Sequence, residues 1–313
     1  MPARQNIILT GAGGDESFMK KKFLVLLILM IAGCRSGSGG RPLTFGLVAD
    51  IQFAASPSSG TRYYSYSWLK LIHNIEEFNR RNVRFIIQLG DLIDHDAASY
   101  DLILPIFKKS KAPIYHVIGN HDFDIDPLLK PFVMAKLGSK NGAYAFSLEK
   151  WRFIILNGDE LSFNYPADDR LKKEAEDMFN KLTEKKRTNA TTWNGGISRV
   201  QFEWLKTELD RAENSRHNVI VFSHFPVLPP ADLNLWNDEE VVSLLEKYPC
   251  VKAFFSGHNH EGNYAFENGI HWVTFKGLVE TGGSNAAAVI TLTQDRIEIK
   301  GLGRELNRSL VIQ

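Results

Sequence analysis

The chain has 313 residues, 44% hydrophobic and 23% charged, which is typical of a globular protein with ample core in one large domain or two small ones. Its 37 Lys and Arg residues nearly balance its 36 Asp and Glu residues, so the net charge is +1. Because no basic excess is available to displace counterions from a phosphate backbone, the composition argues against a nucleic-acid-binding protein.

The first 40 residues are predicted to lie outside the fold. Met19 is followed by three lysines and by the apolar run 23–32, after which small residues lead to Cys34. This order is typical of a secretory signal peptide, and the run is shorter than the ~20 apolar residues that span a bilayer. We therefore expect residues 1–40 to comprise an upstream extension, a signal peptide and a tether, with translation starting at Met19 or, alternatively, at Met1.

The segment that ends at Cys34 resembles the bacterial lipobox. Residues 31–34 read Ile-Ala-Gly-Cys, and in lipoproteins of this pattern the signal is cut before the cysteine, which then carries lipid. The resemblance implies an exported lipoprotein of the bacterial cell envelope, held at a membrane through Cys34 and facing the periplasm or the surface. A plain cleaved signal or a short membrane anchor is the alternative. Cys250 has apolar neighbours and is expected to be a buried, unreactive thiol, not a disulfide partner.

Five short apolar runs are predicted to be buried strands, and each is followed directly by a polar side chain. Sheets with interleaved helices bind ligands outside the carboxyl ends of their strands. One polar residue in such a place can be a turn or a helix cap, but five in succession predict a common site. The runs are 43–49, 84–90, 113–119, 218–223 and 251–257, and the residues that follow them are Asp50, Asp91, Asn120, His224 and His258.

Amphipathic helices are predicted between these runs. One helix begins at Ser198, because Gln201 three residues later completes the pattern of a capping box. The stretch 168–187 is predicted to be a charged helix and linker with a solvated surface. An earlier helix has Trp68, Leu71, Ile72, Ile75 and Phe78 on one face.

Three later apolar runs, 270–275, 287–293 and 296–300, are predicted to be further strands. They would complete a second sheet or extend the first. With no internal repeat in the sequence, we expect residues 41–313 to form a single domain.

The polar residues near the strand ends have the chemistry of metal ligands. They are two carboxylates, two amides and three imidazoles, a set that suits Mn, Fe or Zn better than Ca and is large enough for two ions. Two ions about 3.5–4 Å apart clamp both the attacking and the leaving oxygen of a phosphoryl transfer. The candidate ligands are Asp50, Gln52, Asp91, Asn120, His224, His258 and His260.

In order and spacing, these residues resemble the signature of the calcineurin-like metallophosphoesterases. Each piece is weak alone, but five in the right order are specific. The resemblance runs over about 43–300 and implies an α/β fold of four layers, α/β/β/α, with two central mixed sheets flanked by helices. The matching pieces are Asp50-Ile-Gln52, Gly90-Asp91-Leu-Ile-Asp94, Gly119-Asn120-His121-Asp122, His224 and Gly257-His258-Asn-His260.

The resemblance also implies a role for each residue of the site. His121 would give a proton or a hydrogen bond to the leaving oxygen, and Asp94 is placed to orient its ring. A water acidified by the metals would be the nucleophile. The implied ligands are Asp91 as the bridge, Asp50, Gln52 and His260 at one ion, and Asn120, His224 and His258 at the other.

Gln52 departs from the family pattern, which usually has histidine at this position. An amide oxygen is a harder ligand than an imidazole nitrogen, so the change favours Mn²⁺ or Mg²⁺ over Fe or Zn. A damaged site is the alternative, against which the presence of every other ligand argues. We therefore expect two divalent cations, with Mn²⁺ preferred and Mg²⁺, Fe or Zn as alternatives.

The glutamine also occurs in one subgroup, the manganese-dependent ADP-ribose/CDP-alcohol diphosphatases, and other segments of the chain are similar to that subgroup. The similarity implies a metal-dependent phosphohydrolase, here expected to be monomeric, that cleaves the diphosphate bond of a small nucleotide conjugate such as ADP-ribose or a CDP-alcohol. The similar segments are 46–54, 62–64, 193–198, 235–237 and 277–281.

Several of these segments supply candidate substrate contacts. Arg62 can pair with a phosphate, and aromatic rings can stack on a nucleobase. The segment 194–196 precedes the capped helix, where backbone N–H groups can face an anion. For the aromatic residues the alternative is core packing, and for 194–196 it is a tight turn. The candidates are Arg62, Tyr63, Tyr64, Asn194, Gly195 and Trp236.

Two rival functions remain open on the sequence alone. A broad-specificity phosphomonoesterase or phosphodiesterase would use the same scaffold and the same metals. A surface lipoprotein that keeps the metal site only for structure or for binding would not need His121.

Overall fold

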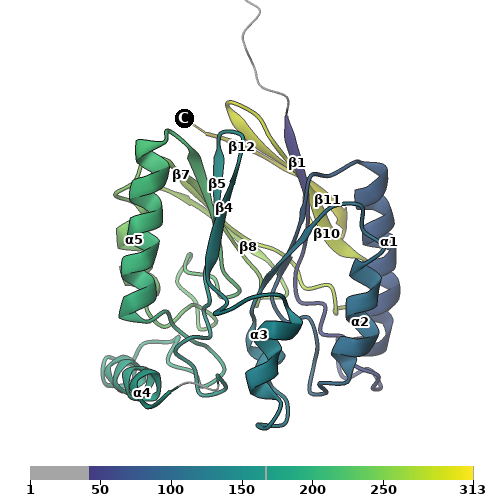
Figure 1. The fold of residues 1–313 in the computed structure, drawn as a ribbon, viewed down its shortest axis with the longest axis horizontal. Coiled ribbons are helices and arrows are strands. Elements are labelled where there is room, and N and C mark those ends of the chain that lie inside the picture. Colours follow the sequence, from purple (N-terminus) through teal and green to yellow (C-terminus); the bar gives the residue numbers. More distant parts are fainter. Residues whose placement is uncertain (1–41, 166–167, 313) are drawn as a thin grey trace, which may run out of the picture. The chain divides into compact units, whose positions relative to one another are not determined.

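Two six-stranded sheets lie face to face, and helices cover the outer face of each, so the layers run α/β/β/α (Figure 1). This arrangement, in a computed structural model that describes residues 42–165 and 168–312, confirms the predicted fold class. All the described residues belong to one compact unit. The predictions for residues 1–40, including the lipid on Cys34, lie outside the described residues. Within the described ranges, no helix has both the length and the apolar character needed to cross a membrane.

The first sheet has the strand order β12-β11-β10-β1-β2-β3. Strands β1, β2 and β3 are parallel, with Leu47 opposite Ile87 and Ile87 opposite Tyr115, whereas β10, β11 and β12 are antiparallel to their neighbours. The strands are β1 (Leu43–Val48), β2 (Ile86–Leu89), β3 (Ile114–Val117), β10 (Ala286–Leu292), β11 (Arg296–Gly303) and β12 (Arg308–Val311).

The second sheet has the order β4-β5-β6-β7-β9-β8. Its four central strands are parallel, and β4 and β8 close its edges as antiparallel strands. The strands are β4 (Tyr144–Leu148), β5 (Trp151–Ile155), β6 (Asn218–Phe222), β7 (Val251–Ser256), β8 (Asn263–Glu267) and β9 (Ile270–Thr274).

Each sheet is covered on its outer side by amphipathic helices. Helices α1 (Ser67–Arg80) and α2 (Ser99–Phe107) bury their apolar faces against the first sheet, and α5 (Arg199–Asn214) and α6 (Asp238–Leu245) cover the second. The remaining helical segments lie in the connections between the strands. They are the short α3 (Val133–Lys136), α4 (Asp169–Glu184) and the 3-10 turns η1 (Tyr64–Tyr66), η2 (Asn120–Phe123) and η3 (Lys130–Phe132).

The core between the sheets is built from aromatic rings. Phe45 of β1 stacks on Phe85 with ring centroids 4.7 Å apart, and Phe153 of β5 meets both rings edge-on at 6.0 and 5.0 Å. Aromatic pairs in such geometries add about 0.5–1.5 kcal/mol to the burial of their area. The two sheets are therefore packed rigidly against each other, which fixes the relative positions of the strand ends that carry the candidate ligands.

The structure corrects several local predictions. The strands β4, β5, β8 and β12 were not predicted from the sequence; three of them, β4, β8 and β12, lie at sheet edges and are only partly buried, which weakens their apolar pattern. Trp68 was placed on the buried face of α1, yet it is 41% exposed. Cys250 was expected to be buried and is half-buried; burial raises the pKa of its thiol to about 11, which disfavours the reactive thiolate.

The cap of α5 forms only in part as a capping box. The Ser198 hydroxyl accepts the backbone N–H of Gln201 at 3.2 Å, as predicted. The side chain of Gln201 is turned inward to Asn157, and the carboxylate of Glu160 accepts the Ser198 N–H instead, at 3.0 Å. The helix start is thereby tied to the loop after β5.

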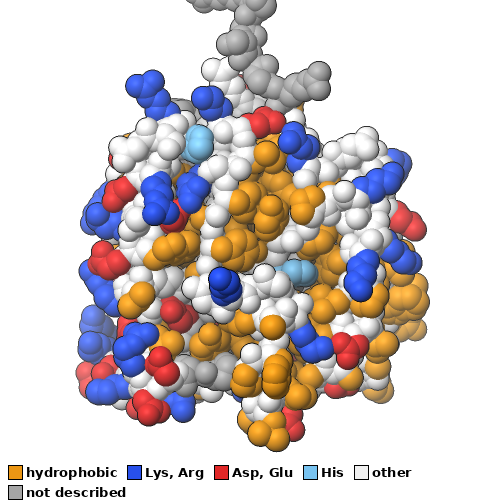
Figure 2. All heavy atoms as spheres, viewed as in Figure 1, with side chains coloured by type: hydrophobic (Ala, Val, Ile, Leu, Met, Phe, Trp, Pro, Cys, Tyr) orange, Lys and Arg blue, Asp and Glu red, His pale blue; other side chains and the backbone are white. Residues whose placement is uncertain are grey.

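The surface is charged but mixed in sign. Figure 2 shows Lys and Arg side chains interspersed with Asp and Glu on the face that it draws, as over α4 and α5. The charged helix α4 was predicted to be solvated, and most of its side chains are, but Leu171 and Ala175 are buried against Trp236.

Candidate metal centre

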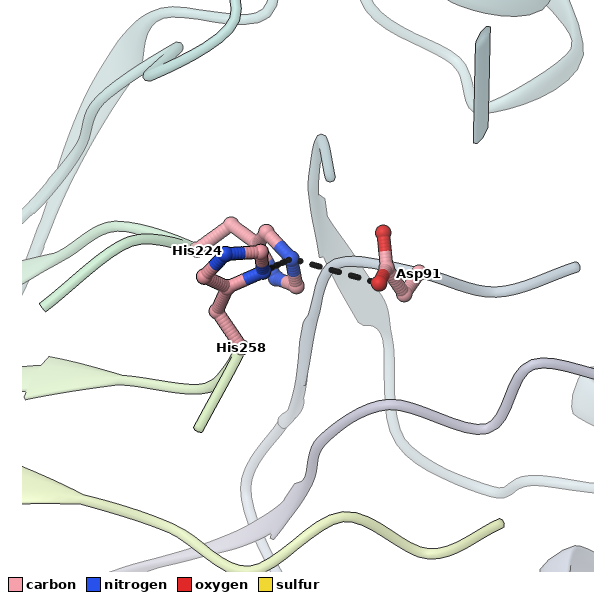
Figure 3. A group of neighbouring side chains, drawn as sticks. All are labelled: Asp91, His224 and His258. Carbon is pink, nitrogen blue, oxygen red and sulfur yellow. Dashed lines mark hydrogen bonds and ion pairs between the residues drawn. The ribbon is translucent and has the colours of Figure 1, made fainter. Parts of the chain in front are cut away.

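The candidate ligands come from five loops that follow the carboxyl ends of β1, β2, β3, β6 and β7. Three of them, Asp91, His224 and His258, have potential ligand atoms within 4.8 Å of one another, and Figure 3 shows their side chains. The loops after the two sheets thus meet, and the prediction that the strand ends share one site agrees with where the structure places these residues.

The ring of His224 is held so that one nitrogen is free to bind a cation. Its Nδ1 lies 2.8 Å from the carbonyl oxygen of Leu89, an acceptor, so in the neutral ring Nδ1 carries the proton and Nε2 a lone pair. That Nε2 is 3.3 Å from Asp91 Oδ2, 3.2 Å from Asn120 Oδ1 and 3.2 Å from His258 Nδ1. Four electron-pair donors therefore face one another.

The other two histidines are held in the same manner. Nε2 of His258 lies 3.1 Å from Asn194 Oδ1, which leaves its Nδ1 facing His224. Nδ1 of His260 lies 2.8 Å from a carboxylate oxygen of Glu280, which leaves its Nε2 at 3.5 Å from Asp50 Oδ1. An imidazole whose outer nitrogen donates to a protein oxygen while its inner nitrogen faces the site is the arrangement of a metal ligand.

A cation fits these donors, and hydrogen bonds alone do not satisfy them. Gln52 is buried and donates from Nε2 to Asp91 Oδ2 at 3.0 Å, yet its own Oε1 has no hydrogen-bond partner among the described residues. A buried acceptor without a partner costs about 1–3 kcal/mol. Carboxylate, amide and imidazole groups that converge in this way are the donor set that divalent cations bind.

The backbone at the ligands is strained, as is common at functional sites. Four candidate ligands that are not glycine adopt left-handed conformations, which few such residues do. Gly90, next to one of them, has a φ of 90°, and a Cβ at that position would lie 2.5 Å from the His224 ring. The left-handed ligands are Asp50 (φ 50°), Gln52 (φ 42°), Asp91 (φ 54°) and His258 (φ 65°).

A buried carboxylate, Asp122, ties two ligand loops together. It accepts the backbone N–H groups of Asp91 and Leu92, each at 3.1 Å, and that of Gly119 at 3.0 Å. The hydroxyl of Tyr100 donates to it at 3.0 Å. Burial and the nearby Asp91 carboxylate raise the pKa of Asp122 to about 6. The loops after β2 and β3 are thereby fixed relative to each other.

His121 and Asp94, the predicted catalytic pair, lie together beside this centre. His121 Nδ1 is 2.7 Å from Asp94 Oδ1, and its Nε2 is 4.0 Å from Asp91 Oδ2. The side chain of Asp94 is fully buried, and that of His121 is partly buried, with 17% exposed. Burial works against the charged form of the imidazole, but the carboxylates of Asp91 and Asp94 outweigh it and raise the pKa of His121.

The structure changes the interpretation of three predicted substrate contacts. Trp236 is 1% exposed and its indole N–H donates to the Thr191 carbonyl, so the predicted stacking on a nucleobase is replaced by core packing. Asn194 is also buried, and its amide is used up by His258 and by two backbone carbonyls. Gly195 is buried against the backbone of Gly158, with no room for a side chain.

The other three predicted contacts stay accessible to solvent. Arg62, Tyr63 and Tyr64 are partly exposed. The charge of Arg62 opposes protonation of His121 and His260, although nearby carboxylates raise the pKa of both rings, and its Nε is 3.9 Å from a carboxylate oxygen of Glu280. A cation placed there faces any anion that binds between the two histidines, whereas substrate contact by the two tyrosines stays a prediction.

Two residues near the centre were not predicted as functional. Glu280 orients His260. The segment 277–281, which contains Glu280, was singled out only by its similarity to the diphosphatase subgroup. Asp159, in the loop after β5, is fully buried, and neither of its carboxylate oxygens has a hydrogen-bond partner among the described residues. Burial raises its pKa well above the usual range, which keeps the carboxyl group neutral. No sequence motif marks Asp159.

The chain matches a known family and several known proteins. Residues 43–262 match the calcineurin-like phosphoesterase family. The manganese-dependent ADP-ribose/CDP-alcohol diphosphatase of Xenopus laevis is 32% identical over 320 residues, 85% of this chain and 90% of that protein. The human protein of the same name is 30% identical over 322 residues, 87% and 94% of the two chains. A crystal structure of a dimetal phosphatase from Danio rerio superposes with a TM-score of 0.78 at 27% identity, covering 87% and 99%.

The charges of the site predict that cation binding releases protons. Burial alone would lower the pKa of His224 and His260. The carboxylates of Asp91 and Asp50 outweigh burial at His224, and those of Asp50 and Glu280 outweigh it at His260. The two pKa values therefore rise to about 10 and about 9. Without a cation both rings hold a proton at pH 7, whereas a cation needs the lone pair. Titrating metal-free protein with Mn²⁺ in buffers of different ionisation enthalpy should therefore show net proton release, with affinity rising from pH 6 toward pH 9. Affinity independent of pH would contradict this ligand assignment.

Proposed function

Because this chain belongs to the calcineurin-like phosphoesterase family and is a metallophosphoesterase, we propose that it cleaves the diphosphate bond of nucleotide conjugates such as ADP-ribose and CDP-alcohols. The observation that carries the chemistry is the convergence of the inner nitrogens of His224 and His258 on Asp91, beside the His121–Asp94 pair. The substrate class is supported by relatives of that name at 30–32% identity over at least 90% of their length.

The residues that would hold two divalent ions are the seven candidate ligands. When bound, such ions neutralise phosphoryl oxygens and acidify a water for attack. Asp91 is central, since its Oδ2 faces His224 from one sheet and Gln52 from the loop after β1. Mn²⁺ is the preferred ion in this proposal, because Gln52 offers an amide oxygen where an imidazole is usual and because the relatives are named manganese-dependent.

His121 serves the leaving group in this proposal. Asp94 accepts a hydrogen bond from the Nδ1–H of His121, so Nε2 is the nitrogen of the imidazole that can pass a proton to a departing oxygen. Its Nε2 is also the one that faces Asp91. Proton donation of this kind contributes typically 10²- to 10⁴-fold to rate.

Arg62 binds the substrate charge in this proposal. A diphosphate carries two phosphoryl groups, and the cations balance only part of their charge. The guanidinium lies within electrostatic range of His121 and His260 and remains partly exposed, so it can pair with a phosphate oxygen in two hydrogen bonds. Tyr63 and Tyr64 directly follow Arg62 in the sequence and are the remaining candidates for contact with a nucleobase.

The test is hydrolysis by residues 41–313 with the metal removed and Mn²⁺ restored. ADP-ribose and CDP-choline should release AMP and CMP only when the cation is present, with a higher kcat/KM than p-nitrophenyl phosphate. A higher kcat/KM on the aryl phosphate would leave the assignment as a metallophosphoesterase unchanged and would contradict the proposed diphosphatase activity.

His121→Ala should lower kcat on these substrates about 10²-fold or more while the metal content stays that of the unaltered protein. Loss of metal in this variant would make His121 a ligand instead. His73→Ala, on the exposed side of α1, is the matched control and should leave kcat unchanged.

Export as a lipoprotein remains a proposal that rests on the sequence of residues 19–34 alone. It would place the enzyme in the envelope, acting on nucleotide conjugates outside the cytoplasm. In a bacterial host, Cys34→Ala should move the protein from the membrane fraction to the soluble fraction. Retention of the variant in the membrane would refute the lipid anchor.

A further inference from the structure

A second histidine, His95, contacts the same carboxylate that orients His121. His95 Nε2 lies 3.1 Å from Asp94 Oδ1, the oxygen that also accepts from His121 Nδ1 at 2.7 Å. The other nitrogen of His95, Nδ1, lies 2.6 Å from a carboxylate oxygen of Asp124. The four side chains thus form one chain of contacts, from the centre to the surface.

Asp94 depends on these two imidazoles for its orientation. Its side chain is fully buried, and its other oxygen, Oδ2, has no hydrogen-bond partner among the described residues. A carboxylate rotates easily about its last bond, because that torsion has only broad minima. Without His95, a single hydrogen bond from His121 would have to hold the carboxylate in place.

His95 is itself fixed at both ends although it is 67% exposed. Carboxylates only accept hydrogen bonds, so both of its contacts are hydrogen bonds when both ring nitrogens carry hydrogen. Its backbone is left-handed, with a φ of 55°, in the loop that follows Asp94. The Asp124 side chain is 51% exposed and follows the turn η2 that carries His121. The His95–Asp124 contact therefore joins the loops after β2 and β3 a second time, in addition to the contacts of Asp122.

We propose that His95, clamped by Asp124, is a positioning residue that holds the Asp94 carboxylate, and through it the ring of His121, in the orientation needed for proton transfer to the leaving oxygen. The inference rests on the proposed function, since it gives His121 that role. The ion-pair partners of His95 are Asp94 and Asp124, neither of which is a candidate metal ligand.

The first test needs no substrate. In Mg²⁺-loaded protein, which is diamagnetic, the Nδ1 proton of His121 should give a far-downfield ¹H resonance, assigned by its absence in His121→Ala. In His95→Ala that resonance should shift upfield or broaden beyond detection. His95→Gln, which places an amide donor near the position of Nε2 at the same left-handed backbone, should retain it. An unchanged resonance in His95→Ala would overturn the proposal.

The second test separates positioning from folding. His95→Ala should lower kcat on CDP-choline roughly tenfold, a part of the 10²- to 10⁴-fold that a proton donor contributes, with KM and metal content unchanged. His95→Gln should recover most of that loss, and Asp124→Ala should show a smaller loss of the same kind. If His95→Ala and His95→Gln lost kcat equally, the effect would come from the backbone and the proposal would fail.

Two further outcomes keep the two proposals apart. If the unaltered protein cleaved no nucleotide diphosphate but the His121 resonance still depended on His95, the proposed function would fail and the positioning role would stand. The cluster of Asp94, His95 and Asp124 also has ligand atoms within 4.8 Å of one another. A third equivalent of metal that disappears in Asp124→Ala would make the cluster a cation site and overturn the proposal.

Discussion

The site depends on one electrostatic constraint, the convergence of buried electron-pair donors around Asp91. Its carboxylate and the inner nitrogens of His224 and His258 lie within a few ångströms of one another, with no hydrogens available to join all of them. Without a cation, the site can be satisfied only by protonating imidazoles, and this is the physical cause of the raised pKa of His224. Binding a cation replaces those protons, so metal affinity, pH and the geometry of the ligands are a single linked property.

The fold keeps these donors close by anchoring the loops that carry them to rigid layers. The phenylalanine rings pack between the two sheets, Asp122 joins two ligand loops, and the outer nitrogen of each ligand histidine lies within hydrogen-bond distance of a protein oxygen. The loop of Glu280, which orients His260, is held from α1. There Lys70 Nζ donates to the carbonyl oxygens of Leu278, Glu280 and Thr281. Burial lowers the pKa of Lys70 to about 8, which is the energetic cost of placing a charge there to hold a loop.

The sequence marks the candidate ligands, whereas most of the residues that support them carry no signal in it, for a physical reason. Five of the seven candidate ligands directly follow an apolar run, and Gln52 and His260 lie two residues beyond such a position, so the local pattern marks them. The residues that orient these ligands are distant in sequence. His224 contacts a carbonyl oxygen 135 residues away, and His258 contacts Asn194, 64 residues away. Such pairs form only through the tertiary packing of two sheets. Trp236 was predicted to contact substrate and is buried instead, also because of tertiary packing. It packs against α4, whose charged sequence had predicted a helix with a solvated surface. The left-handed backbone of the ligands has no signal in residue type, since none of them is glycine.

In the proposed function the Asp91 carboxylate would serve two cations, and metal counting tests this role most directly. Purified residues 41–313, freed of metal, dialysed against Mn²⁺ and measured by inductively coupled plasma mass spectrometry should hold two equivalents. Asp91→Ala should hold close to none, because both ions lose a ligand, while Asp177→Ala, an exposed acid on α4, should keep two. An Asp91→Ala protein that folds and retains one full equivalent would show that Asp91 serves a single ion and would contradict the account.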